Sequence, residues 1–333
     1  MLSASFYLGF SYEGWQEWRY KMDIFQLFNA IPGNIAQGVI WGLMALGVYI
    51  TFRILDFADL SVDGSFATGG AVTVVLVLSG WNVGPALVIA FIAGVIAGLV
   101  TGLLHTKLGI PPILAGILVQ IALYSINLRI MSNKANIAIS VDKYNLLVSL
   151  RFIPKSIIIA CAFAAVIIAL MYWYFGTRQG SAIRATGCNP AMSRAQGINI
   201  NVMKIIALAL SNGVVALSGG LIAQYQGFAD INMGRGAIVI GLAAVIIGEV
   251  FYNALFSKIG NFVVKMVCVV LGGVIYYIVI AIVLWLKMPS NDLKLFTAII
   301  VAIFLAVPYL RDQAKSSFAK AGRKSVAARK EGK

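Results

Sequence analysis

Residues 35–66 read IAQGVIWGLMALGVYITFRILDFADLSVDGSF, a long apolar run that ends in a short segment rich in aspartate. A helix that crosses a bilayer needs roughly 20 predominantly apolar residues, and residues 35–54 contain one charged side chain, Arg53. Of the 333 residues in the chain, 60% are hydrophobic and 11% are charged, whereas a soluble domain carries about 25% charged residues. Lipid must therefore face much of the surface of this protein.

Apolar runs of this kind recur along the chain. They cover residues 35–54, 64–80, 84–104, 111–130, 156–175, 205–226, 236–251, 260–286 and 295–310. The runs at 64–80 and 236–251 are short, as expected of a broken or re-entrant helix that its neighbours bury. The sequence predicts an all-α, polytopic membrane protein with eight or nine transmembrane or partly re-entrant helices.

The positions of lysine and arginine predict how the chain is oriented and divided. The loop at 176–204 holds four of these cations and no acid, and the tail at 311–333 holds eight cations, so both are expected in the cytoplasm. Four runs separate them, an even number, so the two assignments agree, and the same count places the cationic loop at 129–155 outside. We expect a leader or interfacial segment at 1–34, a transmembrane domain at 35–310 and a basic cytoplasmic tail.

A short motif occurs twice in the chain. FADL, which begins at Phe57 and includes Asp59, recurs as FADI, which begins at Phe228 and includes Asp230. In both places a run rich in small residues precedes the motif and a short run follows it. Five predicted spans separate the copies, so their orientations are opposite. Inverted repeats with interrupted helices are common in transporters, where the solute path lies between the halves, and these four residues are candidates for that path.

Three aspartates lie close together at the first copy of the motif. Asp56, Asp59 and Asp63 fall within eight residues between two apolar runs, and a carboxylate in hydrocarbon costs about 2.5–3.5 kcal/mol on insertion scales. One interpretation is a helix break beside the translocation path. The structural alternative is that Asp63 or Ser61 caps the following helix, while Asp56 and Asp59 bond nearby backbone amides or pair with Arg53.

The loop at 176–204 contains the signals that start and stop a short helix. Asn189 suits the N-cap position, Pro190 suits the first helical position, and Gly197 suits the left-handed position after the last turn. A helix of under two turns between two spans has little of its own chain to pack against. It is either a contact for a soluble partner or a solvated helix that rests on its own spans.

Several motifs of catalytic or nucleotide-binding chains are absent from the sequence. It has no G-x-x-x-x-G-K-[ST] phosphate loop, no H-E-x-x-H metal motif and no G-x-S-x-G nucleophile motif, so we expect neither an enzyme nor a metal or cofactor site in this chain.

Two stretches of the chain resemble a known family. Residues 42–60 with 63–66, and residues 184–198, are similar to the permease subunits of bacterial ABC importers of the branched-chain amino acid and ribose type. The resemblance implies a multi-pass protein of the bacterial plasma membrane with its C-terminus in the cytoplasm. It also implies a second permease copy, an extracytoplasmic solute-binding protein, and separate cytosolic ATPase subunits that bind ATP and magnesium.

The resemblance also implies roles for individual residues. The second stretch looks like the ATPase-contacting loop of that family, which assigns ATPase coupling to Arg184, Ala185, Thr186, Asn189, Pro190, Met192, Arg194 and Gly197. The first stretch has Asp56 and Asp59 where better-known members tend to have Asn and His. This acidic version is similar to a branch that we associate with importers of aromatic amino acids and similar small solutes.

The sequence therefore predicts the permease subunit of an ATP-driven importer for an amino-acid-like solute. One alternative is a secondary transporter that an ion gradient drives, with Asp56, Asp59 or Glu249 as the coupling carboxylate. Alternatively, Glu249 has a structural role and pairs with Lys258 or Lys265 at the membrane interface. A scaffold that moves no solute is a further alternative, although a scaffold has no need of interrupted spans.

Overall fold

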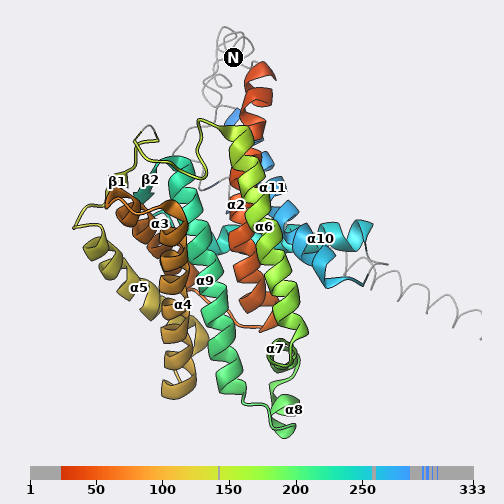
Figure 1. The fold of residues 1–333 in the computed structure, drawn as a ribbon. Coiled ribbons are helices and arrows are strands. Elements are labelled where there is room, and N and C mark those ends of the chain that lie inside the picture. Colours follow the sequence, from red (N-terminus) through yellow and green to blue (C-terminus); the bar gives the residue numbers. More distant parts are fainter. Residues whose placement is uncertain are drawn as a thin grey trace, which may run out of the picture.

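The computed structural model describes residues 24–285 except 142 and 257–259, together with five single positions between 295 and 306. The regular elements in this part of the chain are helices apart from one pair of short strands (Figure 1). The elements are α2 (Ile24–Tyr49), the π-helix η1 (Ile50–Ile54), α3 (Val62–Leu78), α4 (Val83–Leu108), α5 (Pro112–Ile130), β1 (Asn136–Ala138), α6 (Ile153–Gly176), α7 (Arg178–Cys188), α8 (Pro190–Ala195), α9 (Ile200–Gln226), β2 (Phe228–Asp230), α10 (Ala237–Leu255) and α11 (Phe262–Trp285).

The predicted fold class, an all-α polytopic membrane protein, is confirmed. Within the described ranges, seven helices are long and apolar enough to cross a membrane, and α3 is a shorter apolar helix of 17 residues. The short run at 236–251 was expected to mark a second short helix, but it belongs to α10, whose 19 residues are enough for a span. The run at 295–310 lies outside the described residues except for the single positions.

The two most buried spans, α2 and α9, lie antiparallel at the centre (Figure 1). In their most apolar windows 83% and 78% of the residues are buried, compared with 28% in α5. Hydroxyl groups join them, because Ser211 Oγ donates to Gly47 O and Ser218 Oγ donates to Ile40 O, both at 2.7 Å. Small and hydroxyl residues let transmembrane helices approach closely, and a Cβ at Gly47 would lie only 2.9 Å from Ser211 O.

The two halves of the repeat exchange their outer helices. The first half contains α2, η1 and α3 to α5, and the second contains α9, β2, α10 and α11. Helix α4 packs along α9 of the second half, and α11 packs along α2 of the first half. At both contacts glycine brings backbones together, since a Cβ at Gly98 would collide with Leu208 O and a Cβ at Gly38 would lie 2.7 Å from Val274 Cα. This arrangement matches the predicted inverted repeat.

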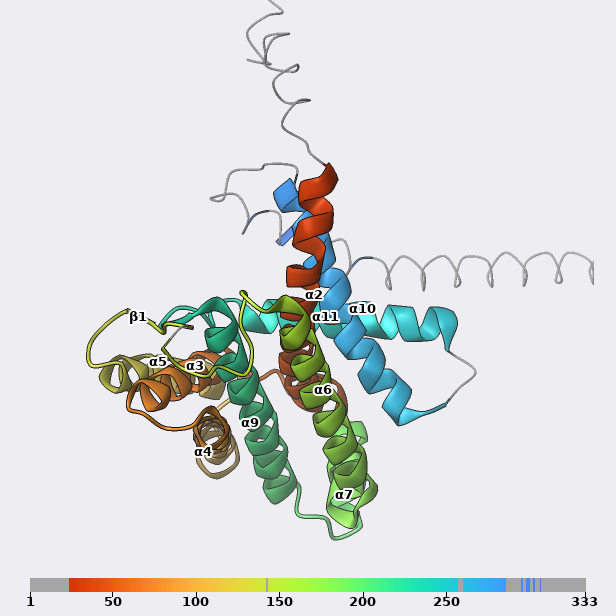
Figure 2. The same ribbon diagram turned by 45° about the horizontal axis from the view of Figure 1, so that its top comes forward.

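The α5–α6 loop and the α7–α8 segment lie at opposite ends of the bundle, as their predicted placement outside and inside requires (Figure 1). At the loop end, β1 pairs with β2 in antiparallel register, with Asn136 opposite Asp230 and Ala138 opposite Phe228. The second copy of the repeated motif is therefore a strand, which the sequence did not predict. Helix α10, which follows, runs across the direction of α2 and α9 in both views (Figures 1 and 2).

Candidate functional site

The first half of the protein contains a true break between helices. After η1 ends at Ile54, Asp56 takes a left-handed conformation (φ 55°), which is unusual for a residue other than glycine. The chain then continues without a helix until α3 begins at Val62. The Asp56 side chain is exposed. The predicted interruption beside 57–60 is therefore present, and single π-helical turns such as η1 are frequent at functional sites.

A buried polar network joins this break to the middle of α9. The Asp59 carboxylate is 2% exposed and accepts hydrogen bonds from Ser61 N (2.9 Å), Ser61 Oγ (2.5 Å) and Asn212 Nδ2 (2.7 Å). Asn212 Oδ1 in turn accepts from Ser65 Oγ (2.5 Å). Asp59 thus bonds a nearby backbone amide, as the structural alternative predicted, but its partner across the bundle is Asn212 and not Arg53. Sequence analysis did not identify Asn212, because the run of small residues around it resembles the runs in other spans.

Asp63 connects the two halves a second time. Its carboxylate accepts from the backbone amides of Gly236 and Ile238, both at 2.9 Å, at the start of α10. The sequence predicted that Asp63 or Ser61 caps the following helix, α3, and this is wrong, because Asp63 caps α10 and Ser61 makes no side-chain cap. A carboxylate at a helix N-terminus satisfies free amides and complements the helix dipole, so the first turn of α3 fixes the first turn of α10.

The second copy of the motif repeats the local turn of the first. Asp230 Oδ1 accepts from Asn232 N at 2.7 Å, as Asp59 Oδ1 accepts from Ser61 N. The surroundings differ, because Asp230 lies on the strand pair, where Asn136 Nδ2 is 3.4 Å from its other carboxylate oxygen.

The phenylalanines of the two motif copies also differ in their surroundings. Phe57 is buried against His105, whose ring centroid is 5.1 Å away, whereas Phe228 is 37% exposed. The structure therefore does not bring the six predicted path residues into one cluster.

Arg53 and Glu249 form an ion pair between the halves. Arg53 Nε lies 2.6 Å from Glu249 Oε1. This corrects two expectations, since Arg53 does not pair with Asp59 and the described partner of Glu249 is not Lys265, which lies over the ring of Tyr252. Lys258, the other expected partner, is outside the described residues. Both side chains of the pair are partly exposed.

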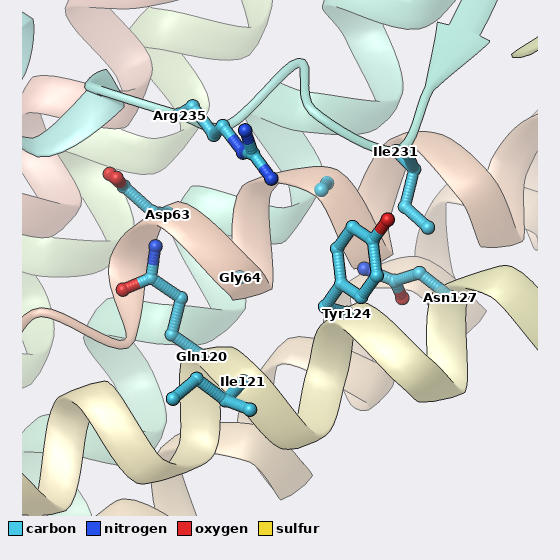
Figure 3. A pocket seen from close by; sticks show the side chains of 9 residues that line it. Asp63, Gly64, Gln120, Ile121, Tyr124, Asn127, Ile231 and Arg235 are labelled. Atoms are coloured by element: carbon cyan, nitrogen blue, oxygen red, sulfur yellow. The ribbon is translucent and has the colours of Figure 1, made fainter. Parts of the chain in front are cut away.

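A cavity of about 310 Å³ lies between α3, α5 and the segment before α10 (Figure 3). It is lined by Asp63, Gly64, Ala67, Gln120, Ile121, Tyr124, Asn127, Ile231 and Arg235. Of these residues the sequence analysis had singled out Asp63 for a role, together with the motif ending at Ile231. Gln120, Tyr124 and Asn127 form a polar stripe at helical spacing on α5, and that periodicity within an apolar span is the signal that could have revealed them.

The α7–α8 segment has the helix start and stop signals that the sequence predicted. Asn189 Oδ1 accepts from Met192 N at 3.0 Å, Pro190 is the first residue of α8, and Gly197 is left-handed at φ 79°. The amides of Gly197 and Ile198 donate to the carbonyls of Arg194 and Ser193, which is the Schellman arrangement at a helix end. Local sequence alone specifies this helix.

Most residues predicted to contact an ATPase are accessible. The exposed ones are Arg184, Ala185, Asn189, Pro190, Met192, Arg194 and Gly197. Thr186 is buried, and its hydroxyl donates to Ala182 O within α7. Next to it, Gly187 lies so close to η1 that a Cβ would collide with Ile54 O. Helix α7 therefore rests on the start of the helix break, while α8 projects from the end of the bundle (Figure 1).

Residues 31–308 match the model of a family described as "Branched-chain amino acid transport system / permease component". A tyrosine transport system permease protein of Clostridioides difficile is 42% identical over 292 residues, which cover 88% of this chain and 96% of that protein. An uncharacterised protein of Rickettsia prowazekii is 33% identical over 56% of this chain and 65% of its own length. A galactofuranose transporter permease of Escherichia coli is 25% identical over 58% of this chain and 56% of its own. No solved structure matches the chain.

Proposed function

Because the chain belongs to the family of branched-chain amino acid transport permeases, we propose that it is the membrane subunit of an ATP-driven importer for an amino-acid-like solute. The observation that carries this proposal is the α7–α8 segment. Its surface is exposed and cationic, and its base contacts the helix break through Gly187. A motion imposed on α8 from the cytosol would reach η1 through α7, and through residues 55–61 it would reach the bond between Asp59 and Asn212.

The proposal includes partners that hold the energy source and the solute. A cytosolic ATPase with ATP and magnesium would bind α7–α8, a second permease copy would complete the membrane part, and a solute-binding protein would deliver the solute from outside. The basic tail at 311–333 would lie on the cytoplasmic side. The name of the relative with 42% identity supports tyrosine or another aromatic amino acid as the solute, in agreement with the acidic version of the first motif.

The charge at Arg194 tests the contact with the ATPase. Arg194→Glu is expected to reduce ATP-driven uptake by roughly tenfold or more, because like charges placed across an interface cost several kcal/mol. Arg194 is exposed in the last turn of α8, so folding should be unchanged. Uptake and ATP hydrolysis are measured in proteoliposomes that contain permease, ATPase and binding protein. Arg129→Glu is the control, since Arg129 is also exposed but lies at the other end of the bundle.

Uptake at the wild-type rate in the Arg194→Glu variant would show that α8 carries no coupling contact. A parallel loss in the Arg129→Glu control would show that the effect comes from the net charge of the protein and not from the position of the substitution.

The rival mechanism, an ion-gradient transporter, is tested at Glu249. The structure supports a structural role for this acid, because its carboxylate is paired with Arg53. Glu249→Gln is therefore expected to change the initial rate of uptake by less than about twofold, since exposed ion pairs contribute roughly 0–1 kcal/mol. Abolished uptake in this variant, together with sensitivity of the wild type to an ionophore at constant ATP, would favour the rival.

A further inference from the structure

We infer that the cavity between α3, α5 and residues 231–236 binds the solute itself, as a zwitterionic α-amino acid whose carboxylate is held by Arg235. The inference rests on the proposed function, because it places the solute of this permease at named side chains. Four observations carry it: the unpaired charge of Arg235, the unsatisfied amide of Asn127, the composition of the lining and its position between the two halves.

Arg235 is a charge without a partner at the cavity. Its side chain is exposed and lines the cavity, and its guanidinium makes no ion pair or hydrogen bond within the described part of the chain. The acid across the cavity, Asp63, is already engaged by two backbone amides of α10. The planar donors of Arg235 match a carboxylate in two parallel hydrogen bonds.

Asn127 is a buried amide without a partner at the same cavity. Its side chain is 1% exposed, and neither Oδ1 nor Nδ2 has a hydrogen-bond partner among the described residues. Leaving such a group unsatisfied costs about 1–3 kcal/mol, so a ligand that offers both a donor and an acceptor would relieve a real penalty. The ammonium and carboxylate of one amino acid are such a pair of groups.

The rest of the lining suits an aromatic side chain. The ring of Tyr124 stands in the cavity between Asn127 and Arg235 (Figure 3), and Ile121 and Ile231 add apolar surface. Aromatic rings pack well against one another in offset or edge-to-face contacts. A cavity of about 310 Å³ is at the small end of the range for small-molecule sites, which fits a single amino acid better than a peptide or a disaccharide.

The cavity also lies where the two halves meet. Gln120 lies near the middle of the 19-residue helix α5 and Tyr124 lies in its second half, and Arg235 lies two residues before the start of α10. The lining thus comes from both halves of the inverted repeat. In transporters with such repeats the solute binds at the interface of the halves, near the middle of the bilayer.

The test measures binding to the purified chain in lipid nanodiscs, without any ATPase. Radiolabelled L-tyrosine is displaced by unlabelled L-tyrosine, by tyramine, which lacks the carboxylate, and by phloretic acid, which lacks the ammonium. We expect saturable binding of L-tyrosine. Either analogue should compete at least about tenfold more weakly than unlabelled L-tyrosine, because each lacks a group that makes a charge-assisted hydrogen bond.

Two variants localise the binding. Arg235→Gln should weaken L-tyrosine binding roughly tenfold while leaving the weak binding of tyramine unchanged, and Arg129→Gln, which removes an exposed arginine outside the cavity, should change neither. Asn127→Leu should also weaken L-tyrosine binding but should not lower the unfolding temperature, since it removes two unsatisfied polar atoms. If Arg235 had only a structural role, Arg235→Gln would weaken the binding of L-tyrosine and of tyramine alike.

Three results would overturn the inference: no saturable binding of L-tyrosine, equal binding of tyramine and L-tyrosine by the wild type, or unchanged L-tyrosine binding in the Arg235→Gln variant. If that variant fails to fold, the three ligands on the wild type still decide. Because the assay contains no ATPase, intact binding with no ATP-driven uptake would overturn the proposed function alone, and uptake without binding at this cavity would overturn the inference alone.

Discussion

Asn212→Leu is expected to lower the free energy of unfolding by about 3 kcal/mol, and with it the amount of folded protein in the membrane. The substitution removes the Nδ2 donor from Asp59 and the Oδ1 acceptor from Ser65. The Asp59 carboxylate is 2% exposed, so no water replaces the lost donor. A hydrogen bond to a charged group contributes about 1.5–3 kcal/mol, and a buried polar group without a partner costs more than the average bond.

The measurement is thermal unfolding of the purified variant in detergent, followed by intrinsic fluorescence. Asn201→Leu is the matched control, because Asn201 is an exposed asparagine in the same helix. In the double variant Asp59→Leu/Asn212→Leu the stability should return in part, since two apolar groups replace two coupled polar ones. If Asn212→Leu unfolds at the wild-type temperature, the network does not hold α9 to the helix break.

The second large effect is expected at Gly187, where a single added methyl group should separate α7 from the helix break. A Cβ at this position collides with Ile54 O and would lie 3.0 Å from Leu55 Cα, so in Gly187→Ala α7 must move away from η1. Overpacking of this kind costs about 1–3 kcal/mol, and we expect ATP-driven uptake to fall by roughly tenfold or more while ATP hydrolysis continues. Alanine is the better helix former, so the loss cannot come from helix propensity.

Uptake and hydrolysis are measured together for Gly187→Ala in the reconstituted complex. Gly176→Ala is the control, because Gly176 ends α6 close to the same segment but a Cβ there meets no atom within 4 Å. Wild-type ratios of uptake to hydrolysis in Gly187→Ala would show that contact between α7 and η1 is not the route of coupling.

The features that the sequence predicted correctly are those that neighbouring residues determine. Helix α8 begins and ends where the signals at Asn189, Pro190 and Gly197 place it, because capping depends on a few consecutive residues. The spans were found because hydrocarbon selects long apolar runs.

The features that the sequence did not predict depend on partners far away in the chain. Asp63 caps a helix that begins 174 residues later, and nothing near Asp63 distinguishes that cap from one on its own helix. Asn212 and Arg235 gain their roles only once the two halves meet. Residues 228–230 were not predicted to form a strand, because the strand they pair with lies far away in the sequence, in the α5–α6 loop.

The exchange of outer helices between the halves has a consequence for biosynthesis. When α4 leaves the ribosome, the helix that its glycine face packs against does not yet exist, because α9 ends 118 residues later. At about 5–20 residues per second the nascent chain waits roughly 6–24 seconds with this face in contact with lipid or with the insertion machinery. A chain that stops after α6 should therefore be degraded, and only synthesis of the second half should rescue the first.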